Sequence, residues 1–332
     1  MKAAAIGAKR MDKGMKSRYI TLCLIIIAAV VVIVQTIGKQ SDSSGKPLKF
    51  GATYMTMNNP YFVALDESIK EMVESNGDIL ISRDPLQDQE KQNQQIKDMV
   101  EDGIDLLFLN PVNWKEVQPA IEYCKEKEVP IIVVDTNVYE GDKESGIIST
   151  ITSDNYNAGV LCAEDMMKKL KEADIVILNH NDVASANQRV QGFLDTIKDN
   201  PQYRVAANHN VATELEEAME EMKDIISSGL EFDVVLGGND LSALGSLAAM
   251  QMTHMEGNVL LYGIDGSPDA KDMIKAGYME GTSAQSPIGI GDAAAKTAYD
   301  YLEGKPIESS VIIPVEIITK ENLRNYDIAG WQ

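Results

Sequence analysis

Short apolar runs alternate with longer amphipathic stretches along most of the chain after residue 48. The runs are typical of buried strands, and the stretches at 61–76 and 89–102 have the spacing of helices. This alternation predicts an α/β fold in which helices cover both faces of parallel sheets. The runs that we expect to be strands are KFGATYM, DILISR, DLLFLN, PIIVVD, DIVILN, YRVAAN, DVVLGGN and VLLYGID.

The second half of this pattern repeats the first. IKDMVEDGIDLLFLN at 96–110 resembles MKDIISSGLEFDVVLGGN at 222–239, since both run from a helix through a glycine into a strand that ends in Asn. VPIIVVDT at 129–136 resembles NVLLYGIDGS at 258–267, since both are strands that end in Asp. This internal repeat predicts two similar lobes, each with its own parallel sheet.

Each half therefore ends one strand in Asn and a later strand in Asp. Asn110 precedes Asp135 by 25 residues, and Asn239 precedes Asp265 by 26 residues. A single Asn or Asp after a strand is explained well enough as a helix cap. The same pair in both halves favours a binding cleft, because ligands of open parallel sheets bind beyond the carboxyl ends of the strands.

The N-terminus carries a basic segment followed by an uncharged, largely apolar run. Residues 1–18 hold six basic residues and one acidic residue, and residues 19–38 hold no charge. A helix of that length spans roughly 30 Å, close to the thickness of a bilayer core. We expect a cytoplasmic tail at 1–18, a transmembrane anchor or uncleaved signal at 19–38, a linker at 39–47, and everything beyond outside the membrane. A cleaved signal is the less favoured alternative, because an A-x-A-like cleavage site is missing.

Charge and motifs argue against several classes of function. Residues 19–332 hold 24 basic and 50 acidic residues, a balance that repels nucleic acid. His180, His209 and His254 lack metal-ligand spacing, and neither a G-x-S-x-G elbow nor a phosphate-binding glycine loop is present. We therefore expect no enzyme activity, no metal and no cofactor. Cys124 and Cys162, in helical stretches of different halves, are expected to be free buried thiols.

Nine stretches, in order, resemble the type I periplasmic binding proteins, specifically the ribose-binding-like branch: NNPYF, LFLNP, VPIIVVD, SDNYNAG, SANQRVQGF, GGNDLSALG, YGIDGSPDA, TSAQSP and VEIITKEN. The resemblance implies two Rossmann-like lobes joined by a three-strand hinge that crosses near Ser153, Ser286 and Val315. Lobe one is then 48–153 plus 286–315, and lobe two is 154–285 plus 316–332. Proteins of this kind close on a ligand by hinge bending and catalyse no reaction.

The same resemblance implies which residues bind the ligand. Amides and carboxylates would hydrogen-bond sugar hydroxyls, a guanidinium would donate to them, and rings would lie against the sugar's apolar face. The implied ligand-binding residues are Asn59, Tyr61, Phe62, Asn110, Asp135, Arg189, Asn239, Asp265 and Gln285. For Phe62 and Tyr61, packing in the core is the alternative, and for Arg189 a surface position. Asp154 is expected to be a helix cap at the hinge.

Two departures from the ribose-binding pattern argue against ribose itself. Thr136 stands where an Arg is expected after Asp135, and Ala212 stands where lobe two should supply an aromatic ring. His180, Asn181 or Trp114 could fill that space. Another pentose, a hexose, an inositol and a furanosyl signalling compound remain open as ligands.

The implied function is that of an extracytoplasmic monosaccharide receptor held at the cell membrane by its N-terminal helix. Its partner would be the permease of a sugar ABC importer. The alternative partner is a membrane sensor histidine kinase of a two-component system, which the closed receptor would regulate as a co-receptor.

Overall fold

The computed structural model describes residues 46–139, 146–212, 214–255 and 257–332. The chain divides into two compact units, Met1–Pro47 and Leu48–Gln332, and the architecture below is that of the second unit. The segments expected to form the tail, the anchor and nearly all of the linker lie outside the described residues. Across the described ranges, none of the helices combines the length and the apolar character that a bilayer crossing requires.

The first lobe is built on a six-stranded sheet with the order β11-β5-β4-β3-β1-β2. Its strands run parallel to one another, as the alternation of strands and helices predicts. The strands are β1 (Lys49–Thr53), β2 (Ile79–Arg83), β3 (Leu106–Leu109), β4 (Ile131–Asp135), β5 (Ile147–Ser153) and β11 (Ser310–Ile313). The helices of this lobe are α2 (Pro60–Ser75), α3 (Gln89–Glu101), α4 (Gln118–Glu126) and α10 (Pro287–Leu302).

The second lobe repeats this plan with the order β12-β10-β9-β8-β6-β7, in which only the pairing of β12 with β10 is antiparallel. The strands are β6 (Ala173–Asn179), β7 (Tyr203–Asn210), β8 (Val234–Gly237), β9 (Leu260–Asp265), β10 (Gly281–Ala284) and β12 (Glu316–Thr319). The helices are α5 (Asn155–Lys169), α6 (Ala184–Ile197), α7 (Leu215–Ser227), α8 (Asp240–Met252) and α9 (Pro268–Ala276), followed by a 3-10 turn at Leu323–Asn325.

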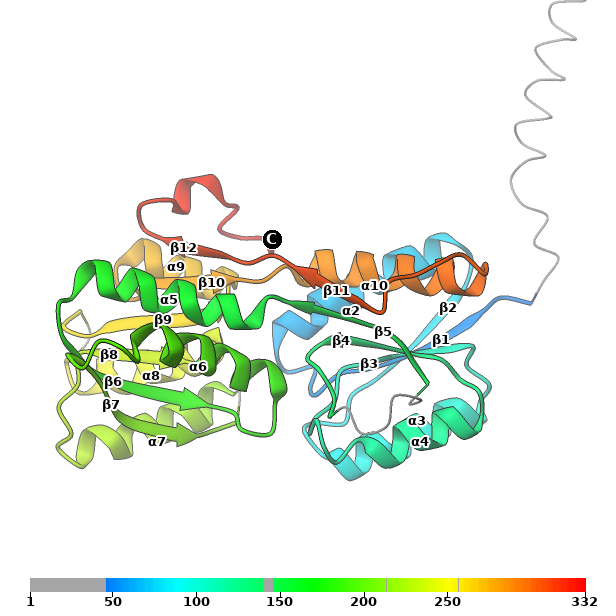
Figure 1. The fold of residues 1–332 in the computed structure, drawn as a ribbon, viewed down its shortest axis with the longest axis horizontal. Coiled ribbons are helices and arrows are strands. Elements are labelled where there is room, and N and C mark those ends of the chain that lie inside the picture. Colours follow the sequence, from blue (N-terminus) through cyan, green and yellow to red (C-terminus); the bar gives the residue numbers. More distant parts are fainter. Residues whose placement is uncertain (1–45, 140–145, 213, 256) are drawn as a thin grey trace, which may run out of the picture. The chain divides into compact units, whose positions relative to one another are not determined.

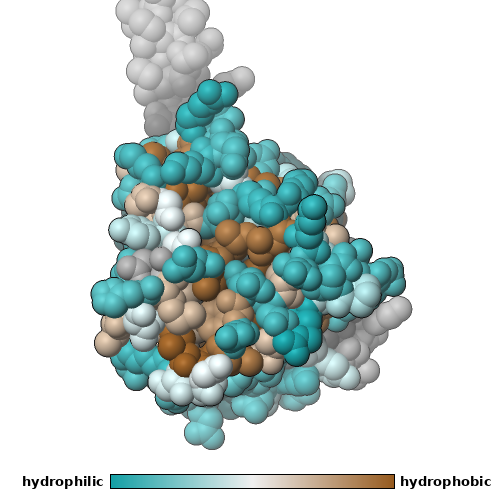
Figure 2. Space-filling view, turned by 90° about the vertical axis from the view of Figure 1, so that its left-hand side faces the viewer, coloured by the Kyte–Doolittle hydropathy of each residue, from teal (hydrophilic) through white to brown (hydrophobic). Residues whose placement is uncertain are grey.

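Both sheets are covered on both faces, which explains why their central strands read as unbroken apolar runs. In β3, Phe108 packs with residues of α2 and α10, whereas its neighbours Leu107 and Leu109 pack with residues of α3 and α4. In β8, Val235 packs with α7, α8 and α9, and Leu236 packs with α5 and α6. Seen from the end of lobe two, hydrophilic residues surround a smaller hydrophobic patch (Figure 2).

The described chain passes between the two sheets three times, in the middle of Figure 1. It leaves β5 at Ser153 for α5, leaves β10 through Gln285 for α10, and continues from β11 to β12 through Val315. Because β11 pairs with β5 and β10 pairs with β12, these connecting segments lie beside one another. Asp154 caps α5 by accepting a hydrogen bond from Asn157 N, as the sequence predicts.

The C-terminal segment beyond β12 contacts both lobes. Lys271 on α9 is fully buried and donates from Nζ to Asp327 O at 2.6 Å. The Trp331 ring packs edge-on against the Tyr61 ring with 5.7 Å between centroids, and Ser286 Oγ donates to Gln332 O. The last residues of the chain therefore run from lobe two onto the start of α2 in lobe one.

Candidate functional site

A cavity lies where the carboxyl ends of the central strands of both sheets meet. The space among its lining atoms, counted with the part that is open to solvent, is about 330 Å³. Of the nine residues predicted from the sequence, all but Asn110 line this cavity. The complete lining is Met55, Asn59, Tyr61, Phe62, Asp135, Val183, Ser185, Ala186, Arg189, Asn239, Asp265 and Gln285.

The NNPYF stretch forms the aromatic wall. Asn59 caps α2 by accepting a hydrogen bond from Tyr61 N at 2.9 Å, and Pro60 occupies the first helical position. This start fixes the next two rings, Tyr61 and Phe62, in an edge-to-face pair with 5.4 Å between centroids. Both rings are almost fully buried and also belong to the core of lobe one. Each ring therefore lines the cavity and packs in the core, the two positions that the sequence analysis considered as alternatives.

Asp135 and Asn110 form the lobe-one side of the polar groups. Asp135 ends β4 with φ at 68°, a left-handed conformation that few residues other than glycine, Asn and Asp adopt. Asn110 Nδ2 donates to Asp135 Oδ2 at 3.0 Å and to Val134 O at 3.3 Å, and its Oδ1 accepts from Met55 N at 3.0 Å. Asn110 is therefore fully buried behind Asp135 and positions that carboxylate instead of facing the cavity.

Asp265, Arg189 and Gln285 form the lobe-two side. Gln285 Nε2 donates to Asp265 Oδ1 at 2.7 Å, and Arg189 Nη1 lies 3.8 Å from the same oxygen. The guanidinium is held by two further bonds, from Nε to Asn155 Oδ1 at 2.8 Å and from Nη1 to Gly238 O at 2.9 Å. Arg189 is thus a fixed, buried group of the site and not a surface charge.

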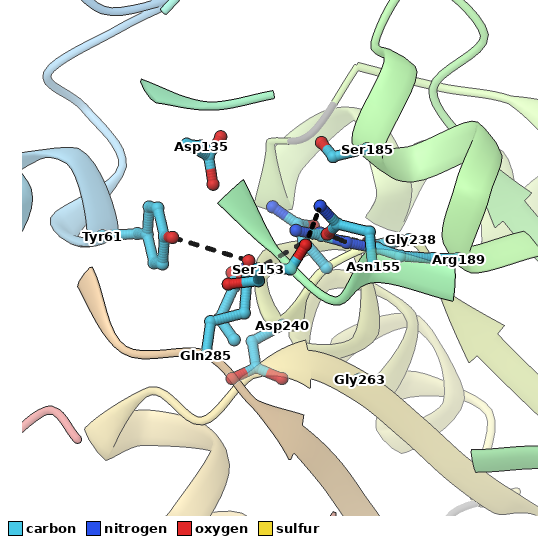
Figure 3. Close-up of polar contacts among 12 residues, drawn as sticks. Tyr61, Asp135, Ser153, Asn155, Ser185, Arg189, Gly238, Asp240, Gly263 and Gln285 are labelled. Carbon is cyan, nitrogen blue, oxygen red and sulfur yellow. Dashed lines mark hydrogen bonds and ion pairs between the residues drawn. The ribbon is translucent and has the colours of Figure 1, made fainter. Parts of the chain in front are cut away.

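The two lobes touch around this cavity through direct hydrogen bonds. Tyr61 Oη donates to Gln285 Oε1 at 3.5 Å, a contact that Figure 3 shows together with Asp135 on the same side as Tyr61. Thr136 Oγ1 accepts from Ser185 N at 2.9 Å, so the residue that departs from the ribose-binding pattern links lobe one to α6. Trp114 N also donates across the lobes, to Asp182 O at 3.2 Å. The structure is therefore that of a closed arrangement.

Asn239 and Asp240 lie at the start of α8 below the cavity. Asn239 lines the cavity and caps α8, because its Oδ1 accepts from Ser242 N at 2.9 Å. No sequence pattern singles out Asp240, which looks like an ordinary acidic residue in a first helical turn. It is buried and accepts hydrogen bonds from Thr282 Oγ1 and Ser267 N, each at 2.7 Å. Gly263 leaves room for this carboxylate, because a Cβ at that position would lie 2.2 Å from Asp240 Oδ1.

Burial dominates the electrostatics of the three carboxyl groups. Desolvation raises the pKa of Asp135 and of Asp240, and raises the pKa of Asp265 well above its usual value. In each case the Arg189 guanidinium opposes this rise and lowers the pKa. Among the described residues no cluster of His, Cys, Asp and Glu has the arrangement of a metal site.

The residues suggested as replacements for the missing aromatic do not line the cavity. The Trp114 ring packs edge-on against Tyr139 at 5.8 Å, beneath Lys115 Nζ. His180 lines a different surface hollow, and the exposed Asn181 accepts a hydrogen bond from Asn179 Nδ2. Val183, Ala186 and Met55 supply instead the apolar wall that the sequence analysis did not identify.

Comparison with known proteins agrees with this architecture. The ribose import binding protein of Bacillus subtilis is 27% identical over 304 residues, which cover 91% of this chain and 97% of that protein. The galactofuranose-binding protein YtfQ of Escherichia coli is 27% identical over 288 residues, covering 84% of this chain and 87% of that protein. An ABC transporter solute binding protein from Bacillus halodurans C-125, solved with bound myo-inositol, has a TM-score of 0.79 at 24% identity and covers 86% of this chain and 99% of that chain.

Residues 50–306 match the family described as periplasmic binding protein domain. This match covers well over half of the chain. The chain therefore belongs to the periplasmic binding protein domain family, and its sugar-binding relatives are transport receptors and not enzymes.

Proposed function

We propose that the chain is an extracytoplasmic receptor that closes its lobes on a monosaccharide or a cyclitol and presents it to an ABC importer. One observation carries the proposal. Asp135 and Asp265, which end corresponding strands of the two lobes, both line one cavity that also holds the Tyr61 and Phe62 rings. The names of the curated relatives, which are import binding proteins for ribose and binding proteins for galactofuranose, support the same reading.

The lining groups match the chemistry of a small polyhydroxylated ring. Carboxylates accept hydrogen bonds from hydroxyl groups, and the guanidinium of Arg189 and the amides of Asn59 and Asn239 donate to hydroxyl oxygens. The two rings provide an apolar surface for the C–H face of the ligand.

A ligand in this cavity would favour closure because it contacts both lobes at once. Asp135 belongs to β4 of lobe one, and Asp265 and Arg189 belong to β9 and α6 of lobe two. A ligand that bonds to both sets binds the closed form more tightly than the open one, and therefore shifts the population toward closure. The importer would then recognise the closed lobes.

The first test is a ligand screen on the purified full-length chain. Pentoses, hexoses and inositols are tested by thermal shift, and positives are measured by isothermal titration calorimetry. We expect at least one ring to raise Tm and to bind with a micromolar or lower Kd. A folded protein that responds to none of these ligands contradicts the receptor proposal.

Substitution of the two strand-end carboxylates tests the site itself. Asp135→Ala and Asp265→Ala each remove a charge-assisted hydrogen bond of about 1.5–3 kcal/mol, so we expect binding to weaken roughly tenfold or more. Asp199→Asn, which changes an exposed carboxylate away from the cavity, serves as the control. Equal affinities in all three variants, with unchanged circular dichroism, would place the ligand elsewhere.

The importer half of the proposal needs a separate test in cells. Deletion of the chain is expected to abolish uptake of the labelled ligand identified in the screen. If uptake persists while ligand-dependent gene expression is lost, the importer role is wrong and the sensor-kinase role predicted as the alternative is favoured. Attachment through residues 19–38 remains part of the proposal and is checked by carbonate extraction of membranes carrying the full-length chain.

A further inference from the structure

The buried charges around the cavity do not balance. Asp135, Asp240 and Asp265 are each at most 4% exposed, and Arg189 is 5% exposed. Among the described residues, Arg189 is the only cation that lines the cavity. Lys271 is close enough to Asp240 for that carboxyl group to act on the pKa of the lysine, but Lys271 Nζ already donates to two backbone carbonyl groups of the C-terminal segment.

The Arg189 guanidinium also lies closer to Asp265 than to Asp135. Its Nη1 lies 3.8 Å from Asp265 Oδ1 and donates to Gly238 O, and its Nε donates to Asn155. No ion pair within 4.0 Å joins it to Asp135 in the described part of the chain. Of the two carboxylates that line the cavity, Asp135 is thus the one without a protein cation within 4.0 Å among the described residues.

One oxygen of Asp135 lacks a hydrogen-bond partner although it is buried. Oδ2 accepts from Asn110, but Oδ1 has no partner among the described residues. Hydrogen bonding from the nearby Tyr61 hydroxyl lowers the pKa of the Asp135 carboxyl, but in this geometry the hydroxyl donates to Gln285 Oε1, at the long distance of 3.5 Å, and Asp135 Oδ1 has no bond of its own. A buried carboxylate oxygen without a donor is costly, so a ligand group that brings donors and positive charge is favoured there.

We propose that the ligand of this receptor is an aminated ring, an amino sugar or an aminocyclitol, whose ammonium group binds Asp135 Oδ1 between the two lobes. An ammonium has three donors and no acceptor, which matches an oxygen without a donor and an excess of buried negative charge. The ring hydroxyls of the same ligand accept from Arg189 and from the amide of Asn59. This proposal rests on the proposed receptor function and names the substrate class of the same cavity.

The test compares matched pairs of ligands on the full-length chain by isothermal titration calorimetry. Each neutral ring is paired with its amine: glucose with glucosamine, galactose with galactosamine, mannose with mannosamine, and myo-inositol with its monoamino derivatives. The N-acetylated sugars control for the nitrogen substituent without its charge. We expect at least one amine to bind roughly tenfold or more tightly than its parent, because a charge-assisted hydrogen bond replaces a neutral one.

The pH dependence of binding and one variant of Asp135 test whether the preference for the amine depends on the charge of the ammonium or on the shape of the ligand. The preference for the amine is expected to decline as the pH rises through the pKa of the ligand ammonium, because the deprotonated amine loses its charge. Asp135→Asn keeps the size of the side chain and its bond from Asn110 but removes the charge, and is expected to lose the preference for the amine. Asp199→Asn, an exposed carboxylate outside the cavity, is expected to retain it.

Two negative results are distinguishable. If neutral rings bind and every amine binds no more tightly than its parent, the amine proposal is overturned and the receptor function stands. If the folded protein binds neither neutral rings nor amines, the receptor function itself fails. An amine preference that survives in Asp135→Asn overturns the assignment of the ammonium to Asp135.

Discussion

At the scale of single residues, the site depends on how Asn110 holds Asp135. Its amide donates to Asp135 Oδ2 and Val134 O and accepts from Met55 N. Asn110→Ala removes these three bonds and takes from the buried Asp135 Oδ2 the donor that satisfies it, at a cost of about 1–3 kcal/mol for an unsatisfied group. We expect a lower Tm and a ligand affinity reduced roughly tenfold, measured by thermal denaturation and calorimetry on the same samples.

Asn181→Ala provides the matched control for that variant. Asn181 was a candidate for the binding site from the sequence, but the structure places its exposed side chain outside the cavity. Its replacement is expected to leave affinity within about twofold of the original, since no more than a few tenths of a kcal/mol is usual for such surface changes. A loss as large as that of Asn110→Ala would contradict this placement.

The sequence predicted the polar strand ends well because the internal repeat marks them. Asn110, Asp135, Asn239 and Asp265 follow from the matching order of Asn and Asp in both halves, and the structure brings all four to one region. The sequence could not show that the Asn110 side chain lies behind Asp135 instead of lining the cavity. A strand pattern does not define which neighbouring groups bond to an amide at the strand end. Asp240 was missed for a similar reason, since an acidic residue in a first helical turn usually faces solvent.

At the scale of elements, the C-terminal segment adds a contact between the lobes that the sequence did not reveal. Trp331 is far in sequence from the Tyr61 ring on which it packs, so local patterns carry no signal for the pair. Edge-to-face ring pairs contribute about 0.5–1.5 kcal/mol beyond the area that they bury. We expect Trp331→Ala to lower Tm and to weaken ligand binding severalfold, because the Tyr61 ring loses its support behind the cavity.

Tyr301→Ala separates this effect from the general loss of an aromatic residue. Tyr301 lies on α10 in lobe one, the lobe that also contains Tyr61, and is 40% exposed. We expect Tyr301→Ala to change both the ligand affinity and the Tm less than Trp331→Ala does. If the two variants behave alike in calorimetry and in thermal denaturation, the C-terminal segment does not support the site.

The elements themselves were predicted to within a residue or two where the apolar pattern was strong. The helices expected at 61–76 and 89–102 span Pro60–Ser75 and Gln89–Glu101. The edge strands β11 and β12 were not identified as strands from the sequence, because edge positions such as Ile312, 63% exposed, lack the continuous apolar run of a central strand. Only the resemblance to a known family indicated that the chain crosses between the lobes there.

At the scale of the whole molecule, the buried carboxyl groups link folding stability to pH. A carboxyl group whose pKa is raised by folding keeps its proton in the folded protein at pH values where the unfolded chain has already lost it. The stability that these groups contribute is therefore full below their unfolded pKa, about 3.9 for Asp, and is lost as the pH rises through the raised folded values. The half-buried Asp174, Asp195 and Asp300, whose pKa values are lowered by hydrogen-bond partners, act in the opposite direction at lower pH.

Asp135→Asn isolates this effect, because the amide cannot ionise. We expect the Tm of this variant, relative to the unsubstituted chain without ligand, to increase as the pH is raised from about 4 to 7. Asp199→Asn, which removes an exposed charge, is expected to follow the unsubstituted chain. Parallel curves for Asp135→Asn and the unsubstituted chain would mean that this carboxyl ionises as easily in the closed cavity as in water. The cavity would then have no need of a ligand cation, so the measurement bears on the substrate class as directly as on stability.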